Sequence, residues 1–148
     1  MAKVNVKMIK SEFFTLAELT KSATAKKLNI DNTPPADVIE NLQYGCDMVL
    51  DPLRRLYGGP IVIGSGYRCK LLNKEVGGVP NSWHQEGNAA DIRVKDIADA
   101  KVKFDLLKKL PSVDTVLCEH SKTSVWLHVQ WSRFKTPRHH FNFNYIVK

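Results

Sequence analysis

The sequence predicts an α+β fold, in which a small, mainly antiparallel sheet has helices packed on it. Between residues 38 and 56 apolar side chains recur at helical spacing, whereas between residues 124 and 131 they alternate one by one with polar side chains. Most expected strands lie in the second half of the chain, which favours α+β over α/β architecture. A length of 148 residues, 43% of them hydrophobic and 25% charged, suits a single folded domain spanning residues 1–148.

Two helices are expected before residue 60. The segment Thr15–Glu18 has the pattern of a capping box, which predicts a short helix running to about Leu28. Thr33–Pro34 predicts the start of a longer helix, because proline fits the first helical turn. Pro52 should kink or break this helix near residue 51, and Gly58–Pro60 should end it. Its expected buried face consists of Val38, Leu42, Cys46, Val49, Leu53 and Leu56.

Strands and helices then alternate. Pro60–Ile63 and Ala89–Val94 are apolar runs between turn residues and are expected to be strands. Cys69–Val76 predicts a short helix closed by two glycines. Asp96 is expected to cap a third long helix, which Pro111 ends. Its expected inward face consists of Ile97, Val102, Leu106, Leu107 and Leu110.

The C-terminal part predicts a hairpin of Val113–Cys118 and Ser124–Trp131, followed by a final strand at Asn142–Val147. Successive side chains of a strand point to opposite faces of the sheet. The second arm of the hairpin should therefore have an apolar face of Val125, Leu127, Val129 and Trp131. Its other face should consist of Ser124, Trp126, His128 and Gln130.

Charge and composition narrow the function classes. A net charge of +7 favours an acidic partner, such as nucleic acid or an anionic cell-wall polymer. The basic residues are scattered, however, and form no stripe interleaved with aromatics, so no specific nucleic-acid partner is expected. No apolar run reaches the roughly 18 residues of a membrane span, so no membrane insertion is expected. Residues 1–14 lack the apolar core of a secretory signal, which predicts a cytoplasmic location until release by another route.

The three cysteines, Cys46, Cys69 and Cys118, are widely spaced and odd in number. This usage favours reduced thiols over a disulfide framework or a thiolate zinc site. They are expected to act as small buried hydrophobic residues.

The segment SWHQEGNAADIRV, residues 82–94, contains His84 and Asp91 with Gly87 between them. From spacing alone, two interpretations are open: a packed histidine beside a solvated acid, or two ligands of one metal ion. The metal interpretation requires a third ligand, and His128 is the best candidate because it lies on the polar face of its strand. Two histidines and one aspartate around an open position form a typical catalytic zinc site. The other histidines, His120 in the hairpin turn and His139 and His140 near the C-terminus, are expected to be solvated.

Several separated motifs occur in order along the chain. They are Ser65-Gly-Tyr-Arg68, Leu72-Asn73, Val76-Gly-Gly78, Ser82-x-His-x-x-Gly-x-Ala-x-Asp91 and Trp126-x-His128. Together they resemble the zinc peptidase family of D-Ala-D-Ala carboxypeptidases and L-alanyl-D-glutamate endopeptidases. The resemblance covers most of residues 13–131 and is closest to the small branch found in phage and bacterial cell-wall enzymes.

The resemblance implies a fold like that of DD-peptidases and Hedgehog proteins, with one zinc ion per chain held by His84, Asp91 and His128. It implies hydrolysis of peptide bonds next to D-amino acids in peptidoglycan stem peptides, at the cell wall, as in an endolysin-like or prophage enzyme. Arg68 matches the family arginine and is expected to polarise the scissile carbonyl or to hold a substrate carboxylate. Without the resemblance, a structural ion pair explains Arg68 equally well.

Other residues of the motifs are candidates for positioning and substrate binding. Ser82 and Gln85 flank the first ligand and are expected to orient it. Ser65, Tyr67 and Trp126 are expected along the substrate cleft, although Tyr67 and Trp126 also suit the core.

The general base is where the chain departs from the family pattern. Many members carry Glu or Asp three positions before the last zinc histidine, and Val125 occupies that position here. With a tight turn around residues 122–123, Glu119 would pair opposite Trp126 and share a face with His128, roughly 7–8 Å away. Glu119 is therefore the expected general base, with His120 as the reserve candidate for proton transfer.

Three functional hypotheses follow. The leading one is a zinc peptidase that acts on peptidoglycan peptides, either as a carboxypeptidase or as an endopeptidase, and as a monomer. The second, favoured by Val125, is a catalytically impaired zinc-containing module that binds cell wall. The third, a nucleic-acid binder, depends on charge alone.

Overall fold

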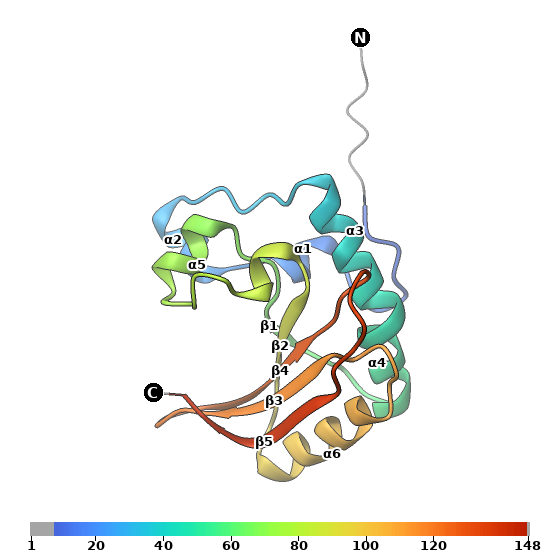
Figure 1. Cartoon of the computed structure of the whole chain (residues 1–148). Coiled ribbons are helices and arrows are strands. Elements are labelled where there is room, and N and C mark those ends of the chain that lie inside the picture. The colour runs from blue at the N-terminus through green and yellow to red at the C-terminus, as the bar shows by residue number, and fades with distance from the viewer. Residues whose placement is uncertain (1–7, 148) are drawn as a thin grey trace.

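The computed structural model describes residues 8–147 and has the expected α+β architecture (Figure 1). Five strands form one sheet in the order β1-β2-β4-β3-β5. Neighbouring strands are antiparallel except β3 and β5, which are parallel. The strands are β1 (Ile63–Ser65), β2 (Ala89–Arg93), β3 (Thr115–His120), β4 (Val125–Gln130) and β5 (His140–Ile146). Residues 1–7 of the stretch considered for a secretory signal lie outside the described part.

Helices pack on one face of this sheet and at one end of it. In Figure 1, α3 and α4 run beside the sheet, α6 lies below them, and α2 and α5 occupy the opposite end of the molecule. The helices are α1 (Leu16–Thr20), α2 (Ala23–Leu28), α3 (Ala36–Gly45), α4 (Asp51–Tyr57), α5 (Lys70–Glu75) and α6 (Ile97–Lys108), with a π-helical turn at Cys46–Leu50 and a 3-10 turn at Trp83–Glu86. Within residues 8–147, no helix is long and apolar enough to cross a membrane.

The two faces of the sheet differ in composition, as the alternation predicted. Leu127 and Val129 of β4 are fully buried in one hydrophobic cluster with residues of α3, α4 and α6. Val125 packs against the same cluster, as expected. The other face of β4 presents Trp126 and His128. The chain therefore builds its core on one side of the sheet and leaves the polar side chains of the other side available for chemistry.

The first two helices differ from the sequence expectation. The Thr15 capping box is confirmed, since the Thr15 side chain accepts from the backbone N–H of Glu18. The helix expected to reach Leu28 is, however, two helices, because Ser22 caps α2 by accepting from the N–H of Ala25. The longer helix stays helical through Pro52. The π-helical turn lies directly before α4, and in it the N–H of Asp51 donates to Cys46 O.

The buried faces of the longer helices also differ in part. Leu56, Ile97 and Val102, all expected to face inward, are about half exposed. Val102 lies two positions from the buried Ala100, and residues at that spacing point to different sides of a helix. The inward face of α6 is formed by Ala100, Lys103, Phe104 and Leu107. The first strand begins at Ile63 rather than Pro60. The three cysteines are free thiols, as expected; Cys46 and Cys118 are buried, whereas Cys69, also expected to be buried, is partly exposed.

Candidate metal centre and catalytic cleft

His84 is presented by the 3-10 turn and is almost completely buried. Ser82 starts this turn by accepting from the backbone N–H of His84, and Gly87 ends it in the left-handed conformation, with φ of 73°. The His84 Nδ1 lies 2.7 Å from the carbonyl oxygen of Gly66. Because a carbonyl oxygen only accepts, Nδ1 carries a proton, which leaves Nε2 as the nitrogen of this ring that can bind a metal. That Nε2 points at Asp91 Oδ1, 3.3 Å away.

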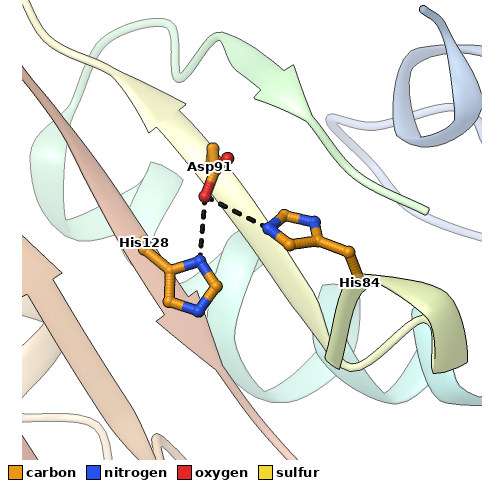
Figure 2. A group of neighbouring side chains, drawn as sticks. All are labelled: His84, Asp91 and His128. Carbon is orange, nitrogen blue, oxygen red and sulfur yellow. Dashed lines mark hydrogen bonds and ion pairs between the residues drawn. The ribbon is translucent and has the colours of Figure 1, made fainter. Parts of the chain in front are cut away.

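Asp91 and His128 lie directly opposite each other on β2 and β4. The His128 Nδ1 is 2.9 Å from Asp91 Oδ1, and its Nε2 is 2.8 Å from Gln130 Oε1. Figure 2 shows both imidazoles converging on the same carboxylate oxygen. One possible ligand atom from each of His84, Asp91 and His128 lies within 4.8 Å of the others. The fold thus brings together three residues that are far apart in the sequence.

The chemistry of these donors fits a zinc ion. Two imidazole nitrogens and a carboxylate oxygen are typical zinc ligands, and three protein ligands leave a position open. The nitrogen of each ring that faces away from Asp91 is held by an oxygen, that of Gly66 for His84 and that of Gln130 for His128. Such contacts fix the orientation of a histidine that binds metal through its other nitrogen.

Gln130 was not among the residues singled out by sequence. The sequence spacing could have indicated this residue, because Gln130 lies two positions after His128 and therefore on the same face of β4. Nothing in the sequence alone showed that its side chain turns back along the strand to reach the imidazole.

The charges of the cluster favour an ionised carboxylate at its centre. Burial raises the pKa of Asp91, but the two imidazoles outweigh burial and hold that pKa well below its usual range. Burial lowers the pKa of His128, but the hydrogen bond and charge of Asp91 outweigh this and raise it. The carboxylate is thus ionised, which is the state in which it binds a cation.

Glu119 lies on the same face of the sheet, opposite Trp126 in the β3–β4 register. The expected pairing is therefore confirmed. Its Oε1 is 3.9 Å from His128 Nδ1, and its side chain is only 16% exposed. Burial raises the pKa of Glu119, and Asp91 adds to this; His128 and Arg68 act against them without reversing the shift. Glu119 is the acid nearest to the three ligands on this face, while its role as general base stays a prediction.

Arg68 extends into the same hollow, which measures about 480 Å³ and also contains His84, Asp91, Glu119 and His128. Its backbone N–H donates to His84 O. Its Nε is buried without a hydrogen-bond partner in residues 8–147. Burial lowers the pKa of Arg68, while Asp91 and Glu119 act to raise it. A guanidinium beside the cluster with an unused N–H is suited to bind an oxygen of a ligand.

The other candidates are distributed over three places. Trp126 and Ser82 line the same hollow as the metal cluster. Ser65 lines an adjoining hollow that shares Asp91 and Trp126 with it. Tyr67 and Gln85 line a separate hollow. The side chain of Gln85 donates to Pro80 O, so it does not orient His84 as expected.

His120 does not lie in the hairpin turn. It is the last residue of β3, and its Nε2 is 3.0 Å from Phe143 O. Alternation along β3 places it on the face opposite Glu119. It therefore does not approach the metal cluster, whereas His139 and His140 are exposed, as expected.

Comparison with known families identifies a peptidase family. The family model of Peptidase M15 matches residues 12–130. Comparison with curated proteins gives no match. The matched segment includes the three possible ligands, Arg68 and Glu119, and it ends at the last residue of β4.

Proposed function

The chain belongs to the zinc D-Ala-D-Ala carboxypeptidase-like Peptidase M15 family, and from this premise we propose that it is a zinc-dependent peptidase that cleaves peptidoglycan stem peptides. One observation carries the proposal: His84, Asp91 and His128 converge within 4.8 Å on the same face as Glu119. A single zinc ion would be held by these three residues. When bound, zinc supplies a Lewis acid that lowers the pKa of water and polarises a carbonyl group.

The protein side chains have separate roles in this reaction. Glu119 accepts a proton from the attacking water and returns it to the leaving amine. Arg68 donates hydrogen bonds to the substrate oxygen that becomes negatively charged. Gly66 O and Gln130 hold the two imidazoles in position. Both carboxylates thus have distinct tasks, with Asp91 binding the cation and Glu119 transferring the proton.

The shape of the site favours cleavage of an internal peptide bond. The hollow of about 480 Å³ meets a second one of about 470 Å³, and both include Asp91 and Trp126. The second hollow extends past Ser65 and Arg93. Substrate residues can therefore extend from the cluster into a second hollow, which suits an endopeptidase. The net charge of +7 would favour adsorption to an anionic cell wall, the proposed place of action.

A second candidate function is a zinc-containing module that binds cell wall without cleaving it. Val125, at the position where many family members carry the catalytic acid, favours it, because its side chain packs against the core and cannot transfer a proton. The two candidates differ in whether Glu119 serves as the base.

The decisive experiment measures zinc content and hydrolysis of purified peptidoglycan for the native protein and for Glu119→Gln. We expect the native protein to release internal cleavage products and to lose activity on chelation. Glu119→Gln should keep its zinc but lose activity by about 100- to 10,000-fold, because the amide cannot accept the proton.

The matched control is Glu75→Gln, since Glu75 is an exposed carboxylate at the end of α5. It should retain full activity. Native protein that binds zinc but releases no product would contradict the peptidase proposal and favour the wall-binding function. Undiminished hydrolysis by Glu119→Gln would show that another group is the base.

A further inference from the structure

The chain beyond the family match forms one wall of the cleft. The match ends at residue 130, and β5 follows it as the edge strand beside β3. Three residues of this C-terminal segment, Arg138, Tyr145 and Val147, line the same hollow as the possible metal ligands. Tyr145 lies opposite Glu119 in the β3–β5 register. This segment therefore adds surface to the site that the matched segment does not supply.

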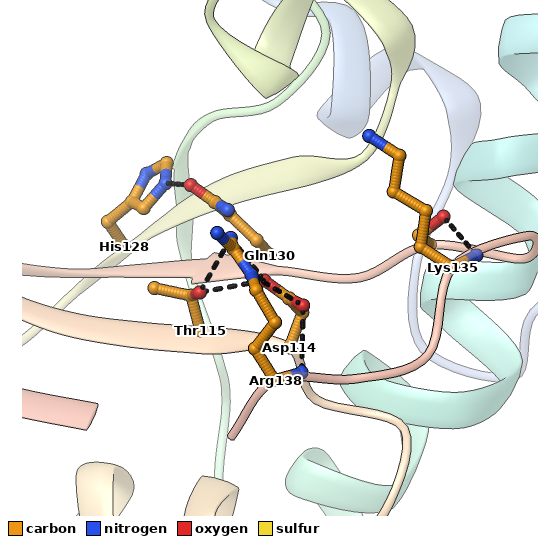
Figure 3. A network of polar contacts seen from close by, with 7 residues as sticks. Asp114, Thr115, His128, Gln130, Lys135 and Arg138 are labelled. Atoms are coloured by element: carbon orange, nitrogen blue, oxygen red, sulfur yellow. Dashed lines mark hydrogen bonds and ion pairs between the residues drawn. The ribbon is translucent and has the colours of Figure 1, made fainter. Parts of the chain in front are cut away.

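Arg138 is held in one orientation by Asp114 (Figure 3). Its Nε donates to both carboxylate oxygens at 3.1 Å, and its Nη2 donates to Oδ2 at 2.7 Å. Its backbone N–H donates to Asp114 Oδ1 at 3.0 Å. Asp114 is 2% exposed, so the carboxylate lies behind the guanidinium and away from solvent. Such a fork of parallel hydrogen bonds fixes a guanidinium more firmly than a single contact does.

Thr115 and Gln130, which pair across β3 and β4, link this guanidinium to His128 of the metal cluster. Its Nη2 donates to Thr115 Oγ1 at 3.3 Å. Thr115 lies opposite Gln130 in the β3–β4 register, and Gln130 contacts His128. Side chains of residues directly opposite on paired strands lie about 5 Å apart on the same face. A substrate bound at the metal centre would thus pass within reach of Arg138.

The outer side of Arg138 remains available to a ligand. The side chain is 59% exposed, and within residues 8–147 its Nη1 donates no hydrogen bond, unlike Nε and Nη2. The guanidinium also lies over the ring of Trp83, 5.4 Å from the ring centre, and Lys135 Nζ lies 5.2 Å from the same ring. Trp83 therefore contacts the guanidinium in this cleft, while Lys135 lines the separate hollow on which Trp83 also borders. The N–H groups of Nη1, held in a fixed orientation, can therefore donate to a carboxylate oxygen of a ligand.

We propose that Arg138 is a specificity-determining residue that binds a free carboxylate of the peptide substrate, in the part of the cleft formed by the C-terminal segment. This assignment rests on the proposed peptidase function and narrows its substrates to acidic peptides. The carboxylate can belong to an internal glutamate or to the free C-terminus of the peptide. Both sources share the same chemistry.

The test uses synthetic stem peptides in two pairs with the zinc-loaded protein. In one pair the free carboxyl group of the glutamate is replaced by a carboxamide; in the other, the C-terminal carboxylate is replaced by an amide. In one of the two pairs, we expect kcat/KM to be about tenfold or more higher for the carboxylate peptide than for the amide peptide. The difference should lie mainly in KM, because the amide peptide lacks a charge-assisted hydrogen bond. The pair that shows the preference identifies the source of the carboxylate.

Arg138→Met should reduce this preference to near unity, and Arg138→Lys should restore part of it. Arg138→Met also leaves Asp114 unpaired and lowers the folded fraction, but this affects both peptides of a pair equally and leaves their ratio unchanged. Arg133→Met is the control, since Arg133 contacts Glu40, Asn41 and Phe134 outside the hollow, and it should keep the native preference.

Equal kcat/KM within both pairs for the native protein would overturn the assignment, as would a native preference retained by Arg138→Met. No hydrolysis of any peptide by the zinc-loaded native protein would refute the proposed function itself, and the assignment with it.

Discussion

At the scale of single residues, strand alternation explains where the acid of this site comes from. Val125 precedes His128 by three positions and points to the opposite face of β4, where it packs against the core. Glu119 reaches the site from the neighbouring strand, because its partner Trp126 shares a face with His128. A neighbouring strand can thus supply the acid beside a metal site when a hydrophobic residue occupies the position three residues before the last histidine.

Gln130 has a comparable supporting role, which can be tested separately from hydrolysis. Gln130→Ala removes the oxygen that holds His128 Nε2, so zinc affinity should fall by about 10- to 100-fold while the fold is retained. Competition with a chromophoric chelator measures this change. Gln85→Ala is the control, because Gln85 adjoins His84 in sequence but donates to Pro80 O, and it should bind zinc like the native protein. Equal losses in both variants would contradict the role of Gln130.

At the scale of elements, the 3-10 turn is the part of the site whose geometry depends most on one residue. Gly87 ends the turn with φ of 73°, and a Cβ there would lie 2.8 Å from Val38 Cγ1 and from Val38 O. The close approach brings the segment between His84 and Asp91 against α3. Only glycine combines this backbone conformation with so little space.

Gly87→Ala should therefore destabilise the protein more than the backbone conformation alone explains. Gly58→Ala provides the comparison, since Gly58 has φ of 75° and a Cβ added there would meet nothing within 4 Å. We expect Gly58→Ala to lower the free energy of unfolding by about 1 kcal/mol, and Gly87→Ala by at least about 1 kcal/mol more. Urea denaturation of the metal-free protein measures both values. Equal losses would show that the contact with α3 relaxes at no cost.

At the scale of the whole molecule, a partly buried polar network connects α4 and α6 beside the core. Asp99 of α6 accepts from Tyr57 Oη at 2.6 Å, from Lys103 Nζ at 2.8 Å and from the backbone N–H of Lys95 at 2.9 Å. Burial raises the pKa of Asp99, but these hydrogen bonds outweigh it and lower the pKa to about 2. The lowered pKa means that the folded state stabilises the ionised carboxylate.

This network should make stability depend on pH in acid. The ionised Asp99 adds roughly 2 kcal/mol to the free energy of unfolding. This contribution is fully present above the unfolded pKa of 3.8 and is lost as the pH falls through about 2. The difference in unfolding free energy between native protein and Asp99→Asn should thus be constant above pH 5 and shrink towards pH 2. Asp105→Asn, which removes an exposed pair with Lys101, should show little difference at any pH. If the difference in unfolding free energy between the native protein and Asp99→Asn is the same at pH 5 and at pH 2, the ionised carboxylate of Asp99 is not its source.

The sequence by itself determined the features that depend on local spacing. These include the Thr15 cap and the alternation of β4. The α+β class followed from the order of the expected elements, and His84, Asp91 and His128 were chosen as possible ligands because several separated motifs resemble the peptidase family. Helix caps involve neighbours within a few residues, and alternation follows from the geometry of a single strand, so each leaves a direct trace in the sequence. The hairpin register that faces Glu119 with Trp126 could also be predicted, because a short turn fixes it.

Only the tertiary structure decided which side chains meet across the fold. Gly66 O and Gln130 orient the two histidines, Gln85 turns away, and Arg138 reaches the cleft from the segment beyond the family match. The exposure of Val102 on α6 was likewise decided by packing against the sheet rather than by hydropathy. The contacts of Gly66 O and Arg138 join residues from separate elements, and the directions of the Gln130 and Gln85 side chains depend on the groups around them. Spacing along the chain encodes neither.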